Sequence, residues 1–456
     1  MIFEIEKNAE KYGNKPAYWV DGKTYTYFEL FERAKEISKE LIQIKSSSAL
    51  IFANRSFEAM AAIIACIISR IAYVPVDISL PEERREKIIK YSKSSVIIDC
   101  SGEKAIIKKI GTEEKTKENE TAYIIFTSGS TGEPKGVPIS YENLDNFIRW
   151  IKELEPMNQL EDEAVLNHAS FSFDLSTAAI FYALFGGHTL VQYENDGNFE
   201  HLFSAMKENK TGVLVATPTF IRLCLLNGDF SEKEYPFIKC IYFCGETLQK
   251  SLVYALFKRF PKIRIINAYG PTEATSAVCA AEITKETLEN EETLPVGIIS
   301  FAATEIAIEN EEIVLKGKSV FEGYLGKQSG GYYKENEKNC FKTGDLGYVR
   351  DGKIYFKGRK DNQIKYKGYR IELSDIEANI FSVSGIEDCA VIAKRNTEGE
   401  VRIIKAFVCG NISEKELRTE LLKKLPEYMV PKTIKFLEKL PLNQNGKTDR
   451  KALESL

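Results

Sequence analysis

The chain has 456 residues, of which 44% are hydrophobic and 28% charged, and its formal net charge is -4. This length exceeds what a single hydrophobic core usually serves, so we expect at least two domains with the composition of ordinary globular proteins. Lys and Glu are interspersed rather than gathered in basic blocks, which argues against a nucleic-acid-binding surface. The longest apolar stretch, Ala59–Ser69, is too short to span a bilayer, and we expect a buried helix and no membrane insertion.

The first residues, MIFEIEKNAEKYG, lack the basic region followed by an apolar core that marks a secretory signal, so we expect a cytoplasmic protein. Its nine cysteines form no C-x-x-C pair, which favours reduced thiols. Its three histidines share no metal-ligand spacing with those cysteines. The pattern therefore predicts no structural zinc site.

Short β-branched runs alternate with helical patterns over the first part of the chain. The runs ALIFANR, AYVPVD and SSVIID are flanked by stretches such as FELFERAKEISKELIQI, whose apolar residues recur at helical spacing. The alternation continues through YIIFTSG, EAVLNHAS, HTLVQYE, TGVLVAT, IKCIYFCG and IRIINAYG. Strand–helix alternation predicts an α/β fold with parallel sheets covered by helices.

The predicted secondary structure changes at about residue 294 to short strands joined by tight turns. Asp351-Gly352 between two alternating runs predicts a β-hairpin in a small β-rich subdomain. After Arg359 a second α/β mixture follows. We therefore predict a large N-terminal domain over residues 1–360, which includes the β-rich part, and a small mobile α+β domain over residues 361–456.

Residues 124–138 read IIFTSGSTGEPKGVP and are the first segment that indicates chemistry. Glycines and hydroxyl side chains let a backbone curl around an anion, and Lys135 adds a positive charge. The segment follows a strand, at the sheet edge where α/β proteins bind ligands. The kinase spacing G-x-x-x-x-G-K-[ST] is not met, because Gly132 is followed by Glu-Pro-Lys-Gly. The alternative is a solvated turn; we expect a phosphate-binding loop.

Six segments in order then carry a resemblance to a known family: TSGSTGEPKGV, FSFDLS, NAYGPTEAT, FKTGDLGYV, GRKDNQIKYKGYRIE and PLNQNGKTDRK. Together they resemble the motifs of the adenylate-forming superfamily, which includes acyl-CoA synthetases, luciferases and the adenylation domains of peptide synthetases. The resemblance implies ATP and Mg²⁺ as cofactors. It also implies two half-reactions: a carboxylate and ATP give an acyl adenylate and pyrophosphate, and the acyl group then passes to a thiol.

The same resemblance assigns roles to individual residues. Taken alone, these peptides also fit turns with an exposed Glu or Asp and a solvated Lys. In the superfamily they bind the parts of MgATP, and the C-terminal lysine is catalytic. The residues so assigned are Thr127, Ser128, Gly129, Ser130, Thr131, Gly132, Lys135 and Thr272 for the phosphates, Asn267 and Tyr269 for adenine, Asp345 for the ribose hydroxyls, Arg359 for ribose or phosphate, Glu273 for Mg²⁺, and Lys447 for catalysis.

Asp174 indicates which class of carboxylic acid is the substrate. At this place amino-acid adenylation domains carry an Asp that pairs with the substrate ammonium, whereas acyl-CoA synthetases do not; the alternative is a helix N-cap. The segment around IYFCGETLQ resembles the D-alanine–D-alanyl carrier protein ligases, in which the positions of Cys244, Ala268 and Ser276 face the side-chain pocket. Those ligases typically carry Thr and Val at the last two positions, so we expect room for a larger or more polar side chain. The stretch near residues 300–317 is also shorter than in those ligases, which we interpret as loop trimming.

The thiol is expected on another protein. The stretch FGGHTL resembles a carrier-protein attachment site, but it has Thr189 in place of Ser and lies inside the large domain, so it predicts a tight turn. The expected partner is a separate phosphopantetheinylated carrier protein. Asp361 matches the family hinge, and Gly368 and Tyr369 would border the pantetheine tunnel. The resemblance thus implies activation of a small amino acid, with D-alanine favoured. The alternatives are a different amino acid for a peptide-synthetase-type pathway, an acyl- or aryl-CoA synthetase, and a non-catalytic sensor.

Overall fold

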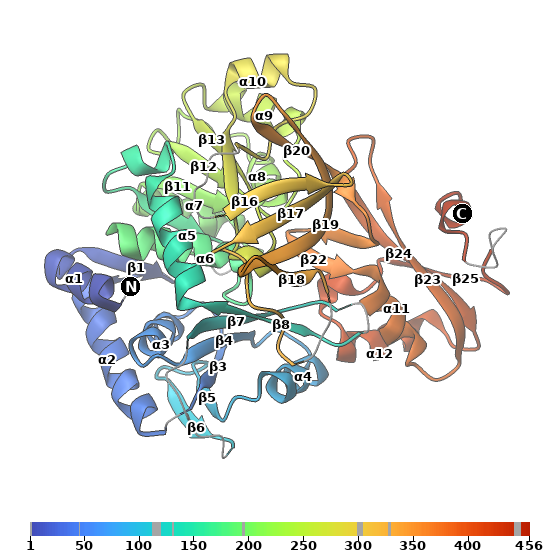
Figure 1. Ribbon diagram of the computed structural model, residues 1–456, viewed down its shortest axis with the longest axis horizontal. Coiled ribbons are helices and arrows are strands. Elements are labelled where there is room, and N and C mark those ends of the chain that lie inside the picture. The colour runs from blue at the N-terminus through green and yellow to red at the C-terminus, as the bar shows by residue number, and fades with distance from the viewer. Residues whose placement is uncertain are drawn as a thin grey trace. The chain divides into compact units, whose positions relative to one another are not determined.

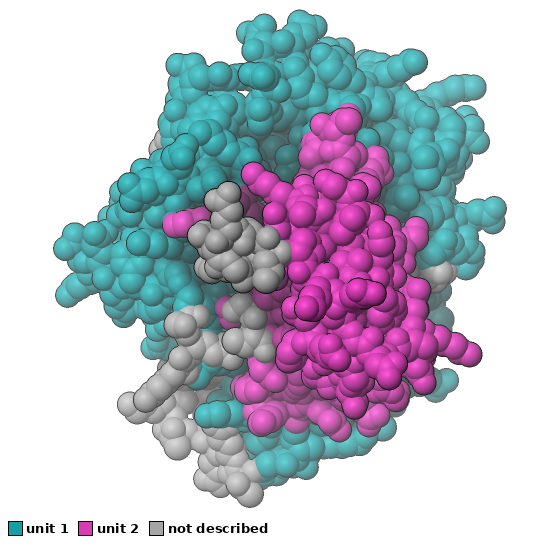
Figure 2. Space-filling view, turned by 90° about the vertical axis from the view of Figure 1, so that its right-hand side faces the viewer, with its two compact units in different colours: residues 1–78, 92–125, 136–358 teal, residues 79–91, 126–135, 359–456 magenta. Residues whose placement is uncertain are grey.

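The computed structural model describes residues 2–44, 46–111, 120–129, 132–193, 197–298, 304–326, 330–441 and 448–456 (Figure 1). The chain divides into two compact units, which Figure 2 shows in different colours. The first unit contains residues 1–78, 92–125 and 136–358, and the second contains residues 79–91, 126–135 and 359–456.

The largest sheet of the first unit has the strand order β14-β13-β12-β11-β9-β10-β1-β2. Its inner pairs are parallel, and its edge strands β2 and β14 pair antiparallel. The strands are β1 (Pro16–Val20), β2 (Lys23–Thr26), β9 (Ala164–Asn167), β10 (Leu190–Gln192), β11 (Thr211–Ala216), β12 (Cys240–Phe243), β13 (Arg264–Tyr269) and β14 (Cys279–Glu282).

A second sheet has the order β6-β5-β3-β4-β7-β8. Strand β3 pairs in parallel with β4 and β5, as the strand–helix alternation predicts. The phosphate-loop segment connects its last two strands. The strands are β3 (Ser48–Ala53), β4 (Ala72–Asp77), β5 (Val96–Asp99), β6 (Ile106–Lys109), β7 (Thr121–Thr127) and β8 (Lys135–Ser140).

Helices cover both faces of the largest sheet. Alternate residues of β12 enter two separate cores: Tyr242 lies in the core that contains α5 and α6, and Phe243 lies in the core that contains α7, α8 and α9. The helices of this unit are α1 (Ile2–Tyr12), α2 (Tyr27–Ile44), α3 (Phe57–Ile68), α5 (Tyr141–Glu153), η1 (Met157–Gln159), α6 (Asp174–Gly186), α7 (Phe199–Glu208), α8 (Pro218–Cys224), α9 (Lys250–Arg259), η2 (Thr272–Ala274) and α10 (Lys285–Asn290).

Two predictions about apolar and turn-like segments are confirmed in this unit. The apolar stretch that begins at Ala59 lies in α3, which is buried along most of its length. The stretch FGGHTL is a turn: α6 ends with Gly187 as its C-cap at a φ of 79°, and β10 follows. Among the helices that the structure describes, none combines the length and the apolar composition that a bilayer crossing requires.

The β-rich part forms an antiparallel sheet in the order β15-β20-β19-β17-β16, with β18 paired to β19. Asp351 and Gly352, both with positive φ, form the predicted hairpin turn between β19 and β20. A second tight turn at Asn310 and Glu311 joins β16 to β17 directly, within the stretch that is shorter than in the resembling ligases. The strands are β15 (Gly297–Ile298), β16 (Thr304–Glu309), β17 (Glu312–Gly317), β18 (Tyr332–Glu335), β19 (Lys338–Arg350) and β20 (Lys353–Arg359).

The second unit combines the C-terminal part of the chain with two earlier segments. Helix α4 joins it through an ion pair of 3.3 Å between Arg84 and Asp375, and both side chains are buried. Asn379 also donates a hydrogen bond to Asp375. The elements are α4 (Glu82–Ser92), β21 (Gln363–Tyr366), β22 (Tyr369–Glu372), α11 (Leu373–Phe381), β23 (Ile386–Arg395), β24 (Val401–Gly410), α12 (Glu414–Lys424), η3 (Glu427–Met429), β25 (Thr433–Phe436) and α13 (Arg450–Glu454).

Candidate active site

Asp174 and Thr272, for which sequence analysis predicts substrate and phosphate contacts, are directly connected. Thr272 Oγ1 donates a hydrogen bond of 2.6 Å to Asp174 Oδ2. Asp174 is the first residue of α6, and the N-cap position belongs to Phe173, which has an extended backbone. The alternative interpretation of Asp174 as a helix N-cap is therefore wrong. Instead, the Asp174 carboxylate is oriented by the hydroxyl of Thr272, which lies in the loop after β13.

The loop after β13 folds back sharply on itself. A side chain at Gly270 would place its Cβ 2.5 Å from the Cα of Ala277, so only glycine fits there. Thr275 and Ser276 follow with φ angles of 61° and 70°. In this conformation the backbone oxygen of Ser276 accepts a contact of 3.8 Å from the Cys244 thiol. The sharp turn thus brings two residues of the predicted amino-acid pocket together.

Ala268 lies two residues before Gly270 on β13 and is buried in the same core as Cys244. Strands β12 and β13 run parallel in register, with Tyr242 opposite Ile266. Because side chains alternate along a strand, Cys244 and Ala268 continue the face that Tyr242 and Ile266 begin. The structure therefore gathers the predicted pocket residues at the carboxyl ends of β12 and β13.

The predicted adenine and ribose residues also meet. Tyr269 donates a hydrogen bond of 2.6 Å from its hydroxyl to Asp345 Oδ2, and both side chains are buried. Burial raises the pKa of the Tyr269 hydroxyl well above its usual value, and the charge of Asp345 adds to the shift. Asp345 is further positioned through its backbone N–H, which donates to Thr343 Oγ1 at 3.0 Å.

Asn267, the other predicted adenine contact, has a structural partner. Its side-chain nitrogen donates a hydrogen bond of 2.8 Å to the carbonyl oxygen of Pro295. This bond fixes the orientation of the buried amide. An amide held in this way can present its remaining donor and its oxygen to a base edge.

Glu273 is almost fully buried, and Tyr324 donates a hydrogen bond of 2.6 Å to its Oε1. Within the described ranges, no group of three or more His, Cys, Asp or Glu is placed to hold a metal ion by itself. Mg²⁺ commonly binds through one or two carboxylates together with substrate phosphates. The donor set of Glu273 beside the Thr272 hydroxyl fits that mode of binding.

In the second unit, the predicted phosphate loop is hydrogen-bonded to the β21–β22 hairpin. The Ser128 hydroxyl donates to the carbonyl oxygen of Arg370 at 2.9 Å and accepts from the N–H of Glu372 at 3.1 Å. Gly132 has a φ of 80°, and a Cβ there would lie 3.0 Å from the Cβ of Ala378 on α11. The sequence pattern does not predict these contacts, because Ser128 is separated from Arg370 by 242 positions and from Glu372 by 244 positions.

The other residues of the predicted phosphate loop lie on either side of Ser128. Thr127 ends β7 and Lys135 begins β8. The N–H of Gly132 donates to the carbonyl oxygen of Gly129 at 3.1 Å. Ser130 and Thr131 lie outside the described residues.

Arg359 and Asp361, the predicted nucleotide contact and hinge, form a bidentate pair. Arg359 Nε donates to Asp361 Oδ1 at 2.9 Å, and its Nη2 lies 2.6 Å from Oδ2. Burial opposes ionisation of Asp361, but the hydrogen bonds and charge of Arg359 outweigh it and hold the pKa below its usual value. Tyr369 stacks on Tyr428, with ring centroids 3.6 Å apart. Lys447, the predicted catalytic lysine, lies outside the described residues.

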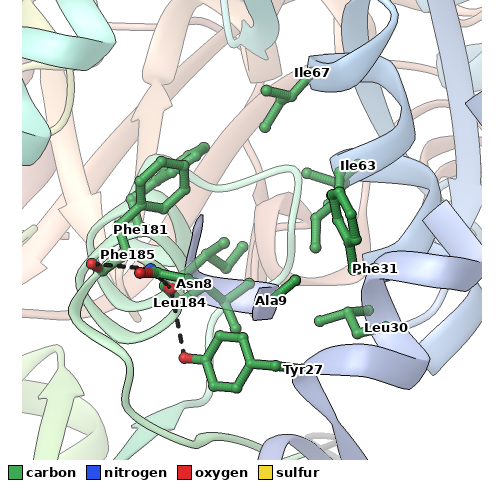
Figure 3. A pocket seen from close by; sticks show the side chains of 12 residues that line it. Asn8, Ala9, Tyr27, Leu30, Phe31, Ile63, Ile67, Phe181, Leu184 and Phe185 are labelled. Carbon is green, nitrogen blue, oxygen red and sulfur yellow. Dashed lines mark hydrogen bonds between the residues drawn. The ribbon is translucent and has the colours of Figure 1, made fainter. Parts of the chain in front are cut away.

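An apolar pocket lies beside the C-terminal half of α6, whose first residue is Asp174. Figure 3 shows its lining side chains. Helices α1, α2, α3 and α6 line it, with Phe181 and Leu184 on α6. Asn8 closes one side by donating hydrogen bonds to the carbonyl oxygens of Leu184 and Phe185 at 3.0 and 3.3 Å. None of the predicted site residues lines this pocket, so we assign it no catalytic role.

Comparison with known proteins agrees with this geometry. The sequence profile described as AMP-binding enzyme matches residues 5–325, and that described as AMP-binding enzyme C-terminal domain matches residues 375–447. D-alanine–D-alanyl carrier protein ligase of Bacillus licheniformis is 34% identical, over 100% of this chain and 99% of its own. The enzyme of the same name from Listeria monocytogenes is 36% identical, over 100% of this chain and 98% of its own.

Solved structures share the fold. The Vibrio cholerae adenylation domain AlmE, in complex with glycyl-adenosine-5'-phosphate, has a TM-score of 0.85 at 24% identity and covers 99% of this chain and 96% of its own. The o-succinylbenzoate CoA synthetase of Bacillus subtilis has a TM-score of 0.82 at 20% identity, with 99% and 98% covered. The predicted fold class and the predicted enzyme class, a ligase that uses ATP, are confirmed. This chain belongs to the family of AMP-binding enzymes.

Proposed function

We propose that the protein activates a small amino acid with MgATP as its aminoacyl adenylate and then transfers the aminoacyl group to the phosphopantetheine thiol of a separate carrier protein. The observation that carries the proposal is the hydrogen bond from Thr272 to Asp174. It joins the carboxylate assigned to the substrate ammonium with the hydroxyl assigned to the ATP phosphates. The name shared by the Bacillus and Listeria relatives makes D-alanine the first amino acid to test.

A carboxylate at position 174 fits an amino acid better than an acyl or aryl acid. An ionised group enclosed in protein is costly unless a cation or hydrogen-bond donors compensate it. Thr272 supplies one donor to Oδ2, and a substrate ammonium would supply further donors together with the opposite charge. An acyl or aryl acid has no ammonium to offer, so Asp174 argues against a CoA synthetase.

The first half-reaction brings two anions together, since the substrate carboxylate attacks the α-phosphate of ATP. A fixed cation offsets their repulsion and stabilises the charge that develops in the transition state. We assign this task to Lys447. Lys135 and the phosphate-loop hydroxyls would bind the departing pyrophosphate. Mg²⁺ held through Glu273 would supply further charge neutralisation on the phosphates.

Four further residues are assigned to the adenosine part of ATP and to the hinge. Asp345, oriented by Tyr269 and Thr343, would accept hydrogen bonds from the ribose hydroxyls. Asn267 would read the adenine edge. Arg359 would contact ribose or phosphate on leaving its present partner Asp361, the proposed hinge. A change of partner at such a position fits a hinge that absorbs a backbone rotation.

The remaining assignments concern the roles of the two domains, the location of the protein and its carrier protein. We propose a catalytic core over residues 1–360, a mobile lid over residues 361–456 that carries Lys447, and a cytoplasmic location. Retention of Lys135, Glu273 and Lys447 argues against a non-catalytic sensor, which has no use for a catalytic lysine. A carrier protein as acceptor is supported by the name of the Bacillus and Listeria relatives, and an NRPS protein of the same fold, at a TM-score of 0.82, contains a PCP domain beside its adenylation domain.

ATP–pyrophosphate exchange across D-alanine, L-alanine, glycine, D-serine and L-serine tests the first half-reaction. We expect exchange with at least one of these amino acids and its loss in Lys447→Ala. Mass spectrometry of a holo carrier protein incubated with enzyme, ATP and the same amino acid tests the second. No exchange with any amino acid would refute the proposal, and an unaltered Lys447→Ala variant would refute the assignment of the lysine.

A further inference from the structure

Tyr242 and Ser276 carry buried hydroxyls for which the described residues offer no hydrogen-bond partner. The Tyr242 side chain has no exposed surface, and Ser276 is 2% exposed. A buried hydroxyl without a partner destabilises a fold, so native proteins keep few of them and usually for a reason. A ligand or water that reaches these hydroxyls would satisfy them.

Ser276 belongs to the predicted side-chain pocket, and Tyr242 is near in sequence to another of its residues, Cys244. Tyr242 lies on β12 two residues before Cys244, so the two side chains share one face of the strand. The Cys244 thiol in turn contacts the backbone oxygen of Ser276 at 3.8 Å. Ala268, the small residue on the neighbouring strand, lies in the same core. Tyr242, Cys244 and Ala268 therefore share one core, and Ser276 is linked to that core through Cys244.

The electrostatic surroundings of Tyr242 agree with this placement. Burial raises the pKa of its hydroxyl well above the usual value, and Cys244, Cys279 and Asp174 add to the shift in that order. For Tyr123 burial likewise raises the pKa, and Asp174 is the charged group that adds to it. The charge of Asp174 therefore acts on both tyrosine hydroxyls, and Cys244 acts on that of Tyr242.

A pocket for alanine alone needs only apolar contacts around a methyl group. A pocket built with hydrogen-bonding groups discriminates strongly in favour of a substrate that uses them, because the analogue without the polar group leaves them unpaired. Tyr242 can donate or accept, and so can Ser276. A side-chain hydroxyl on the substrate would match both.

We infer that the pocket formed with Tyr242 and Ser276 selects a small amino acid with a side-chain hydroxyl, as in serine, over alanine. The inference rests on the proposed function and specifies its substrate class. In this arrangement Cys244 and Ala268 leave room for the β-carbon, and the two protein hydroxyls bind the substrate oxygen. Tyr242 and Ser276 are then specificity-determining residues, since neither takes part in the transfer of the adenylyl group.

The test is the ratio of kcat/KM for serine to kcat/KM for alanine in pyrophosphate exchange, measured for both enantiomers. We expect the ratio to exceed one in the natural protein and to fall about tenfold in Tyr242→Phe, which removes a single oxygen. Ser276→Ala should act in the same direction. A ratio taken within one variant is independent of the fraction of enzyme that is folded.

Thr211→Val is the matched control. Thr211 is a buried residue on β11 whose hydroxyl also finds no partner in the described part of the chain, and it lies at the start of its strand, away from Cys244. This variant should leave the ratio unchanged. A preference for alanine in the natural protein, or a ratio that neither pocket variant lowers, would overturn the inference while leaving the proposed function intact. Absence of exchange with every amino acid would overturn both.

Discussion

Thr272 donates a hydrogen bond of 2.6 Å to Asp174, although the two residues lie 98 positions apart in the chain. One belongs to the loop after β13 and the other begins α6. Through this bond, the segment assigned to the ATP phosphates is fixed against the carboxylate assigned to the amino acid. The two substrates of an adenylation reaction must be held with this kind of precision before the carboxylate can attack.

Asp174→Asn keeps the shape of the side chain and removes its charge. We expect kcat/KM for the amino acid to fall about 100-fold or more, because losing one partner of an enclosed ion pair typically costs about 2–5 kcal/mol. The dissociation constant for ATP should change little. Exchange kinetics at saturating ATP, with ATP binding measured separately, check the prediction. An equal loss of affinity for both substrates would contradict the ammonium assignment.

Tyr269→Phe removes the hydrogen bond to Asp345, which measures 2.6 Å. Hydrogen bonds to charged groups contribute about 1.5–3 kcal/mol, so we expect ATP to bind about tenfold more weakly once Asp345 is no longer held. Tyr348→Phe is the control, since the ring of Tyr348 stacks on Tyr355 with centroids 4.8 Å apart. Nucleotide titration by calorimetry gives the comparison. Equal ATP affinity in both variants would show that Tyr269 does not support nucleotide binding through Asp345.

Ser128→Ala removes the hydroxyl that links the phosphate loop to the β21–β22 hairpin. The N–H of Glu372 then loses its acceptor, and we expect its hydrogen exchange to become about fivefold faster, as the loss of about 1 kcal/mol implies. Ser382→Ala is the control, because the Ser382 hydroxyl donates to Asn379 at the end of α11 instead. Exchange over residues 363–372 that is equally slow in both variants would contradict the link.

His188 is a source of acid sensitivity. Burial, followed by the charge of Lys15, lowers the pKa of its imidazole to about 4. Because the unfolded chain takes up this proton more readily, the stabilisation is complete above the unfolded pKa of about 6.5 and is lost as the pH falls towards 4. This group should cost about 2 kcal/mol of unfolding free energy between pH 7 and pH 5.

Urea unfolding at these two pH values measures that loss. His188→Gln should show a smaller decrease in unfolding free energy between pH 7 and pH 5 than the natural protein. His201→Gln, which changes an exposed histidine, should show the natural decrease. The same pH dependence in all three proteins would show that His188 is not the group responsible.

The parts of the structure that local pattern determines were predictable. Strand–helix alternation predicted the helix-covered parallel sheets, and Asp351-Gly352 predicted the β19–β20 hairpin, because both depend on residues close in sequence. Ordered motifs predicted the family. Contacts between distant segments were not predictable: nothing in the sequence pairs Tyr324 with Glu273, or Arg84 with Asp375. These pairings depend on where whole elements pack, which the sequence pattern does not encode locally.

At Asp174 the local sequence pattern predicts a contact that the structure does not have. An Asp before an apolar helical run is a common N-cap, and only the family resemblance argued for another role. In the structure the cap position is Phe173, and the Asp174 carboxylate accepts a hydrogen bond from Thr272 instead. Tertiary contact has taken precedence over local preference at a residue assigned to the substrate.

Pyrophosphate exchange with D-alanine, D-serine and propionate, compared under identical conditions, tests amino-acid activation most directly. Propionate has the carbon skeleton of alanine without its amino group, so it cannot pair with Asp174. We predict exchange with at least one of the two amino acids and none above background with propionate. Exchange with propionate equal to that with the amino acids, or exchange with propionate alone, would contradict the assignment of the protein as an amino-acid adenylating enzyme.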